Sequence, residues 1–307
     1  METQFQPQSQ SLSQLSQTDL QRQARAHGIT FIDPRIDYAF KLIFGTPGNE
    51  DLLLMLVRAI LPEKGIISVS LSSQEQVGLR ENARKSVIDV KCTTENGEFL
   101  VIEMQVKPQN DFGDRMLFYS SFPISNLLQK GERDNYRLTP IYLIGITNFI
   151  IPDIRSNDDL INCYSIRNVK DNGIELTGNV HFVTVELPKL KKTLSEVVNS
   201  NEWILYTILH LGEMNEMPSE YVGSGLEKMF GLSIFANMTE AEQYEYLARF
   251  MAERDERSSR RYAREVGYTE GKAAGRAEAA RKMIDLGMDP ALIKQVTGLD
   301  PEQIQTL

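Results

Sequence analysis

Residues Val87–Lys107, VIDVKCTTENGEFLVIEMQVK, predict a β-hairpin at the centre of the fold. Both of its halves are rich in strand-forming residues, and Glu95-Asn96-Gly97 between them is typical of a hairpin turn. Each half carries one acidic residue between apolar neighbours, Asp89 in the first and Glu103 in the second. A charge buried in such a strand lowers stability unless a partner or a metal ion neutralises it. These two acids are therefore candidate functional residues.

The length of the hairpin loop decides whether the two acids meet. A two-residue Asn96-Gly97 turn puts Val90 opposite Glu103. A three-residue loop with Gly97 in the left-handed conformation instead puts Asp89 opposite Glu103, on the same face of the sheet. Two facing carboxylates could hold a divalent cation that activates water for phosphodiester hydrolysis. The alternative is a half-exposed hairpin on which both acids simply face solvent.

The elements around the hairpin predict an α/β core. Apolar residues at helical spacing indicate a helix that begins after Asp33-Pro34 and stops at Gly45. A helix over 51–61 and a strand over 66–71 follow, then the hairpin, a helix over 115–128 and a buried strand over 138–148. The predicted order is helix, three strands, helix, strand, with additional strands over 162–168 and 180–187.

The C-terminal third differs in composition. Residues 241–280 are rich in charge and alanine, and we expect glycines at 267, 271 and 275 to interrupt any single stable helix, which leaves a linker or an extended helical arm. Residues 249–282 hold ten basic and six acidic residues, a local charge of +4 in a chain of net charge -9. This stretch is either a solvated helix face or a local DNA-binding patch. Short helical patterns over 280–286 and 290–296, and a turn beginning at Asp300, predict a small helix-turn-helix-like module.

The pattern divides the chain into four parts: a disordered Gln/Ser-rich leader at 1–28, a core domain at 29–212, a helical extension and charged arm at 213–278, and the small module at 279–307. The leader lacks the features of a secretory signal. The longest apolar runs, such as Ile141–Ile146, are too short to span a membrane. Cys92 and Cys163 have no redox or metal-ligand spacing, so we expect reduced core thiols and a cytoplasmic protein.

Several segments, in order, resemble the PD-(D/E)XK nuclease-family transposases and the recombination-promoting (Rpn-like) nucleases. DYAFKLIFG at 37–45 is similar to the first helix of that family. VIDV at 87–90, VIEMQ at 101–105 and RMLFY at 115–119 are similar to its central segments, and 140–149 and 181–189 to its later strands. The likeness extends over Asp33–Leu211.

The resemblance implies a restriction-endonuclease-like core and a metal-dependent DNA endonuclease. It implies that Asp89 and Glu103 hold Mg²⁺, for which Mn²⁺ can substitute, with help from the Met104 carbonyl. Gln105 stands where the superfamily has a lysine, and its amide could orient the attacking water. Ile88 stands where the superfamily has a proline, which metal binding does not require. Lys107 or Lys91 could supply the missing positive charge.

Four helical residues are accessory candidates. Asp37 and Lys41 lie one turn apart on the first helix, where Asp37 either adds a carboxylate to the site or only complements the helix dipole. Arg115 and Tyr119 lie one turn apart on the later helix and face the site or a phosphate in this family. Structural pairing with a neighbouring acid is the alternative for both.

DNA is the expected partner, and recombination or a mobile element is a biological role that rests on the resemblance alone. Two other functions stay open. One is a catalytically weak descendant that binds nucleic acid through the tail. The other is a protein-interaction module, in which the arm at 241–280 mediates homo-oligomerisation and the acidic surface never meets DNA. Salt-sensitive DNA binding distinguishes the two.

Overall fold

The computed structural model describes residues 15–72, 89–108, 111–129, 138–152, 158–197 and 200–307, without the side chains of 126–129 and 200. The chain forms two compact units, Met1–Ala248 and Arg249–Leu307. Ile88 and the start of the strand predicted from Val87 lie outside the described residues. The candidate site belongs to the first unit.

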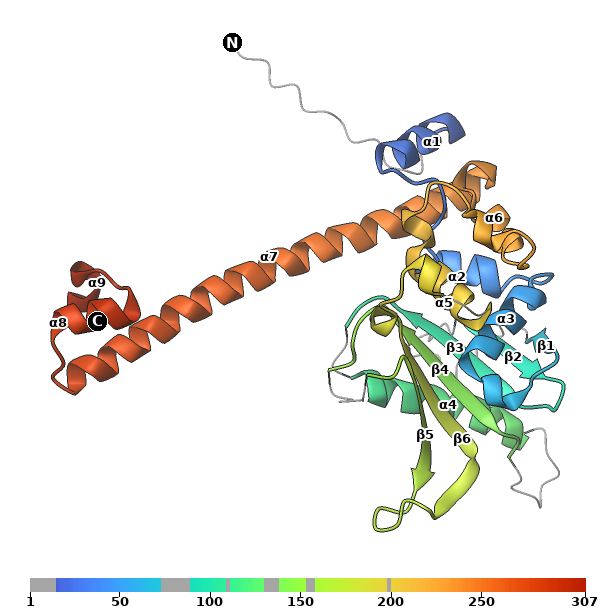
Figure 1. Ribbon diagram of the computed structural model, residues 1–307, viewed down its shortest axis with the longest axis horizontal. Helices are drawn as coiled ribbons and strands as arrows, with labels where there is room; N and C mark the ends of the chain where they lie inside the picture. The colour runs from blue at the N-terminus through green and yellow to red at the C-terminus, as the bar shows by residue number, and fades with distance from the viewer. Residues whose placement is uncertain (1–14, 73–88, 109–110, 130–137, 153–157, 198–199) are drawn as a thin grey trace. The chain divides into compact units, whose positions relative to one another are not determined.

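A single mixed sheet organises the first unit (Figure 1). Its strand order is β1-β2-β3-β4-β6-β5. Strands β1, β2 and β3 pair antiparallel, β3, β4 and β6 run parallel, and β5 pairs antiparallel with β6 at the edge. The strands are β1 (Val69–Leu71), β2 (Val90–Thr94), β3 (Phe99–Gln105), β4 (Ile141–Thr147), β5 (Ile161–Arg167) and β6 (Glu175–Glu186).

Helices cover both faces of this sheet. On one face, α4 (Phe112–Gln129) buries Phe112 and Met116 against Val101, Leu143 and other apolar residues of the central strands. On the other face lie α2 (Asp37–Phe44), α3 (Glu50–Ile60) and α5 (Ser200–His210), and α6 (Glu227–Ser233) contacts α2. The predicted order of helix, three strands, helix and strand is confirmed.

The β2–β3 hairpin has the three-residue loop. Thr94 N–H donates to the Glu98 carbonyl at 3.0 Å, and Gly97 N–H donates to the Thr94 carbonyl at 2.9 Å. Gly97 has φ +77°, a left-handed conformation that glycine adopts without strain. The strands pair from Thr93↔Phe99 to Val90↔Ile102, so the next step places Asp89 opposite Glu103.

Gly145 on β4 pairs with Glu103 and lets α4 approach the sheet closely. A Cβ at this position would lie 2.6 Å from Phe112 Cζ and 3.2 Å from Met116 Sδ. We expect Gly145→Ala to lower the free energy of unfolding in urea by about 1–3 kcal/mol, because the overpacked core must shift. Gly113→Ala is the control, since a Cβ at this position in α4 meets nothing within 4 Å. Equal unfolding curves for wild type and Gly145→Ala would contradict this packing account.

Part of the expected leader is helical, which corrects the prediction of disorder for that part. Residues Gln17–Ala26 form α1, and Ser16 caps it by accepting from Asp19 N–H. Leu20 and Ala24 are each 1% exposed, so the helix buries a small apolar face that the polar composition of the segment conceals. Residues 1–14 lie outside the described part of the chain.

The expected break at the glycines is wrong. Residues Glu240–Asp285 form one continuous helix of 46 residues, α7, which contains all three glycines. Each glycine costs about 1 kcal/mol relative to alanine. The surrounding alanine, arginine, glutamate and lysine residues are strong helix formers, and they outweigh that cost. Of the two predicted states, linker and extended helix, the helix is observed.

The C-terminal module contains the end of α7 followed by α8 (Pro290–Thr297) and α9 (Pro301–Gln305). Asp289 caps α8 through Ala291 N–H at 2.7 Å, and Asp300 N–H donates to the Gln303 side chain at 2.9 Å at the start of α9. Ala280, Ile293 and Ile304 form a small core of their own. This arrangement agrees with the helical patterns predicted for the tail.

The cysteines are both free, but only one is a core thiol. Cys92 on β2 is fully buried, whereas Cys163 on the edge strand β5 is exposed. The expectation of two core thiols is therefore wrong for Cys163. Its strand has one neighbour instead of two, which the local sequence does not reveal.

Candidate functional site

Asp89 and Glu103 are brought together at the open end of the hairpin. They are 3% and 4% exposed, so they are not the solvent-facing acids of the alternative reading. Asp89 N–H donates to Glu103 Oε2 at 3.3 Å, and Met104 N–H donates to Asp89 Oδ2 at 2.7 Å. The backbone of each strand thus holds the carboxylate of the other, and the two acids share one buried site.

A lysine from α2 reaches the same site. Lys41 Nζ lies 3.0 Å from Asp89 Oδ1 and 2.7 Å from Asp37 Oδ1. The apolar side of α2, with Ala39, Phe40, Ile43 and Phe44, is buried in the core and fixes the position of the helix. Asp37 and Lys41 therefore belong to the site by contact.

Glu103 is held from the opposite side by three donors to its Oε1 atom. Gln105 Nε2 donates to it at 2.9 Å, Arg115 Nη2 at 3.0 Å and the Tyr119 hydroxyl at 3.3 Å. Arg115 Nε also donates to the Tyr119 hydroxyl at 2.8 Å, which couples these two residues of α4. The predicted pairing of Arg115 and Tyr119 with a neighbouring acid is observed, and that acid is Glu103 itself.

The site concentrates negative charge in a buried place. The pKa of Asp89 is raised well above its usual range, by burial first, then by the charge of Glu103 and by Asp37, while Lys41 opposes the shift. Burial also raises the pKa of Glu103, against the opposing effect of Arg115. A bound cation would favour the ionised form of both carboxylates. The electrostatics are therefore those of a site that gains from binding a cation.

These shifts predict a pH dependence of stability without metal. Because the folded protein holds protons on the two acids more tightly than the unfolded chain, their contribution declines as pH rises from about 4 through the raised pKa values. We therefore expect Asp89→Asn to gain stability relative to wild type as pH rises. Urea unfolding in EDTA, at about pH 5 and about pH 8, measures this difference. An Asp89→Asn variant whose stability relative to wild type is unchanged or lower at the higher pH would contradict it.

The donor atoms fit a small hard cation. Two carboxylates from neighbouring strands meet here, and Mg²⁺ in proteins is commonly held by one or two carboxylates while it keeps several waters. Within the described ranges, no group of three or more His, Cys, Asp or Glu side chains is placed to hold a metal ion. This agrees with Asp37 being paired with Lys41 rather than completing an all-carboxylate cage.

The Met104 carbonyl is a third candidate donor. Met104 N–H points toward Asp89, and in a strand the N–H and C=O groups of one residue face the same side. Its carbonyl therefore points, within the plane of the sheet, toward the neighbouring segment that carries Asp89. The Met104 side chain is buried, since only 3% of the residue is exposed.

Lys91 and Lys107, which the sequence suggests as sources of the missing positive charge, lie on or beside the hairpin strands, whereas Lys41 lies on α2. Lys91 is half-buried on β2 opposite Val101, and burial lowers the pKa of its ammonium group. Lys107 is half-buried just beyond the end of β3. Lys41 contacts Asp89 and Arg115 contacts Glu103. Sequence reasoning placed Lys41 on the right helix, but no local pattern shows which strand that helix meets.

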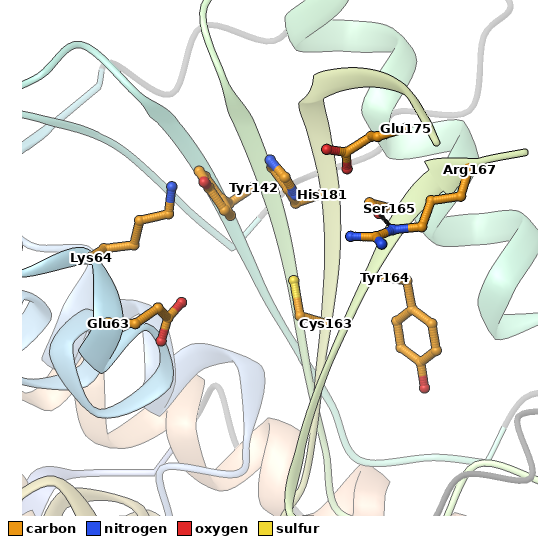
Figure 2. A pocket seen from close by; sticks show the side chains of 9 residues that line it. All are labelled: Glu63, Lys64, Tyr142, Cys163, Tyr164, Ser165, Arg167, Glu175 and His181. Carbon is orange, nitrogen blue, oxygen red and sulfur yellow. Dashed lines mark hydrogen bonds between the residues drawn. The ribbon is translucent and has the colours of Figure 1, made fainter. Parts of the chain in front are cut away.

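A separate hollow of about 520 Å³ lies near the start of β4 (Figure 2). Tyr142 and His181 stack across β4 and β6 with ring centroids 4.6 Å apart, and Lys64 Nζ lies 4.8 Å from the Tyr142 centroid. Tyr142 lies three residues before Gly145, the partner of Glu103, so it points to the opposite face of the sheet. This hollow is therefore distinct from the acidic pair.

Comparison with protein-family models matches residues 34–263 to the family described as PD-(D/E)XK nuclease family transposase. The matched region is more than half of the 307 residues and includes α2, the hairpin and α4. The chain belongs to this family. Residues 277–307 also match the C-terminal HTH domain of the Rpn/YhgA-like nuclease family. Curated proteins and solved structures give no significant match.

Membership of the PD-(D/E)XK nuclease family confirms the predicted family and fold class. The family match spans all the candidate residues, from Asp37 on α2 to Tyr119 on α4. The second match begins near the end of α7 and covers the small core around Ile293. Among the helices of the described residues, none is both long and apolar enough to cross a membrane.

Proposed function

We propose that this PD-(D/E)XK family member is a metal-dependent DNA endonuclease that hydrolyses phosphodiester bonds. One observation carries the proposal: two buried carboxylates, Asp89 and Glu103, meet on neighbouring strands, and burial raises the pKa of both. Two buried acids side by side lower stability unless positive charge or a metal ion compensates them. A functional cation explains why the sequence keeps them there.

Asp89, Glu103 and the Met104 carbonyl would hold Mg²⁺, with Mn²⁺ as a substitute. When bound, the ion polarises the phosphoryl group and lowers the pKa of a bound water. The residues of the chain set the geometry. Met104 N–H orients Asp89, while Arg115 and Tyr119 fix Glu103 from the other side.

Gln105 is the residue proposed to position the attacking water. Its Nε2 atom donates to Glu103 Oε1 at 2.9 Å, which fixes the plane of the amide. The Oε1 atom of the same amide can then accept a hydrogen bond from a water beside Glu103. An uncharged amide can orient this water but cannot neutralise the charge that develops on the phosphoryl group.

DNA is the proposed partner, and the C-terminal helices support this. The HTH match at 277–307 names a domain class that binds DNA through a helix in the major groove. Basic residues of α7 would add phosphate contacts that do not depend on base sequence. A cytoplasmic location, a role in recombination or a mobile element, and homo-oligomerisation through α7 are further parts of this proposal.

Supercoiled plasmid, incubated with the purified full-length protein in magnesium or in EDTA, tests the proposed activity. We expect nicked and linear products in magnesium and none in EDTA. Cleavage that persists in EDTA, or no cleavage in either magnesium or manganese, would contradict the proposal. Salt-sensitive DNA binding without any cleavage would favour the catalytically weak descendant. If DNA does not bind at all, the interaction module becomes the better account.

A further inference from the structure

In the described part of the chain, two helices outside the hairpin bring cations to the acidic pair, Arg115 from α4 and Lys41 from α2. Position 105, on the strand that carries Glu103, holds a neutral amide, and that amide already donates to Glu103. Arg115 lies at the other side of the pair and is bonded to Glu103 and to the Tyr119 hydroxyl. Lys41, in contrast, approaches Asp89 from a different element, α2.

We propose that Lys41 supplies the positive charge of this site. A lysine at position 105 would otherwise have this role. Lys41 stabilises the negative charge that builds on the phosphoryl group as the ester bond breaks. This inference rests on the proposed nuclease function and adds a residue to it. The observation that carries it is the contact of Lys41 Nζ with both Asp89 and Asp37.

The position of Lys41 is preorganised. Its neighbours Phe40 and Ile43 are fully buried, so the backbone of α2 cannot shift easily. Asp37, one turn earlier, holds the ammonium group at 2.7 Å. A charge fixed before the reaction stabilises a transition state more effectively than one that must first reorganise.

The lysine also keeps enough freedom to contact a substrate. Its side chain is 22% exposed, and Nζ has three donors, of which two point at Asp37 and Asp89. Its flexible four-carbon stem allows Nζ to turn toward a phosphate oxygen near Asp89 while Asp37 keeps hold of it. Arg115 is less suited to this role, because its donors are committed to Glu103 and Tyr119.

Two variants test the proposal, each compared with wild type for plasmid nicking at saturating magnesium. We expect Lys41→Met to lower kcat about 100-fold, the effect typical of losing one preorganised electrostatic contact. Lys41→Arg should retain part of the rate, because the charge is kept.

Metal binding separates this role from structural support. Manganese titration followed by electron paramagnetic resonance should show that Lys41→Met binds the ion at least as tightly as wild type, since an ammonium group no longer competes for Asp89. Lys228→Met, which removes a surface lysine paired with Asp51, is the control for charge loss alone. Thermal unfolding shows that each variant is folded.

Three results would overturn the role of Lys41: a Lys41→Met variant that cleaves like wild type, one that loses manganese, or a Lys41→Arg variant that cleaves no faster than Lys41→Met. The last two would make Lys41 only a support for Asp89. If the wild type itself cleaves nothing in magnesium, the proposed nuclease function fails as well. The two failures are therefore distinguishable.

Discussion

Replacing Asp89 by asparagine, or Glu103 by glutamine, is expected to lower the initial rate of magnesium-dependent plasmid nicking by at least about 1000-fold. A metal ion acting as a Lewis acid contributes several kcal/mol to the barrier, and every 1.4 kcal/mol corresponds to a factor of about ten. Each substitution removes one of two charged ligands while preserving the shape of the side chain. Both variants should therefore fold and still fail to cleave.

Glu202→Gln is the matched control for these variants. Glu202 is a partly buried acid of α5 that pairs with Lys192, so its loss tests the removal of a carboxylate elsewhere in the same unit. We expect its nicking rate to stay within about threefold of wild type, since surface pairs contribute little. Nicking by Asp89→Asn at the wild-type rate would show that the cleavage belongs to another site or to a contaminant.

DNA binding is expected to weaken strongly when the core of the C-terminal module is disrupted. Ile293 is 1% exposed in the small core with Ala280 and Ile304, so a charge at this position should unfold the module. We expect Ile293→Asp to weaken binding of a fluorescent duplex in EDTA by at least about tenfold, because phosphate and base contacts are lost together. Fluorescence anisotropy over a range of salt concentrations measures the change.

Ile293→Val is the conservative control for this experiment, because it keeps an apolar side chain in the same core. It should bind DNA like the wild type. The Ile293→Asp variant should still nick plasmid at high protein concentration, since the acids belong to the other compact unit. Unchanged affinity and an unchanged salt dependence in Ile293→Asp would show that the module packs without contacting DNA.

The hairpin could be predicted from sequence because its determinants are local. Gly97 requires a left-handed turn, the turn sets the register, and the register sets the faces of Asp89 and Glu103. The metal-binding role of the two acids is a proposal that rests on the family likeness and on their burial. The order of the strands along the chain followed from the same alternation of apolar segments and turns.

The contacts between distant segments could not be predicted in this way. Lys41 and Asp89 are separated by 48 positions, and only the packing of α2 brings Nζ to the carboxylate. The sequence marked Lys91 and Lys107 as sources of charge because they share a strand with the acids. The contact of Lys41 with Asp89 depends instead on the direction from which α2 approaches the hairpin.

Two helical segments, Gln17–Ala26 and α7, differ from what their sequences predict. The polar segment Gln17–Ala26 buries only Leu20 and Ala24, too few apolar residues to stand out from its glutamines. In α7 the three glycines favour a break, but the many helix-forming residues around them outweigh that cost. In both segments the stability of the helix is the sum of many small contributions, and no single residue shows that sum.

We propose that Asp89 and Glu103 bind one metal ion together. A crystal of the full-length protein soaked in manganese, with data collected at the manganese absorption edge, would locate that ion. We predict an anomalous peak within roughly 2.5 Å of a carboxylate oxygen from each acid. A crystal without this peak, in which Lys41 and Arg115 remain bound to the two carboxylates at high manganese, would contradict the account.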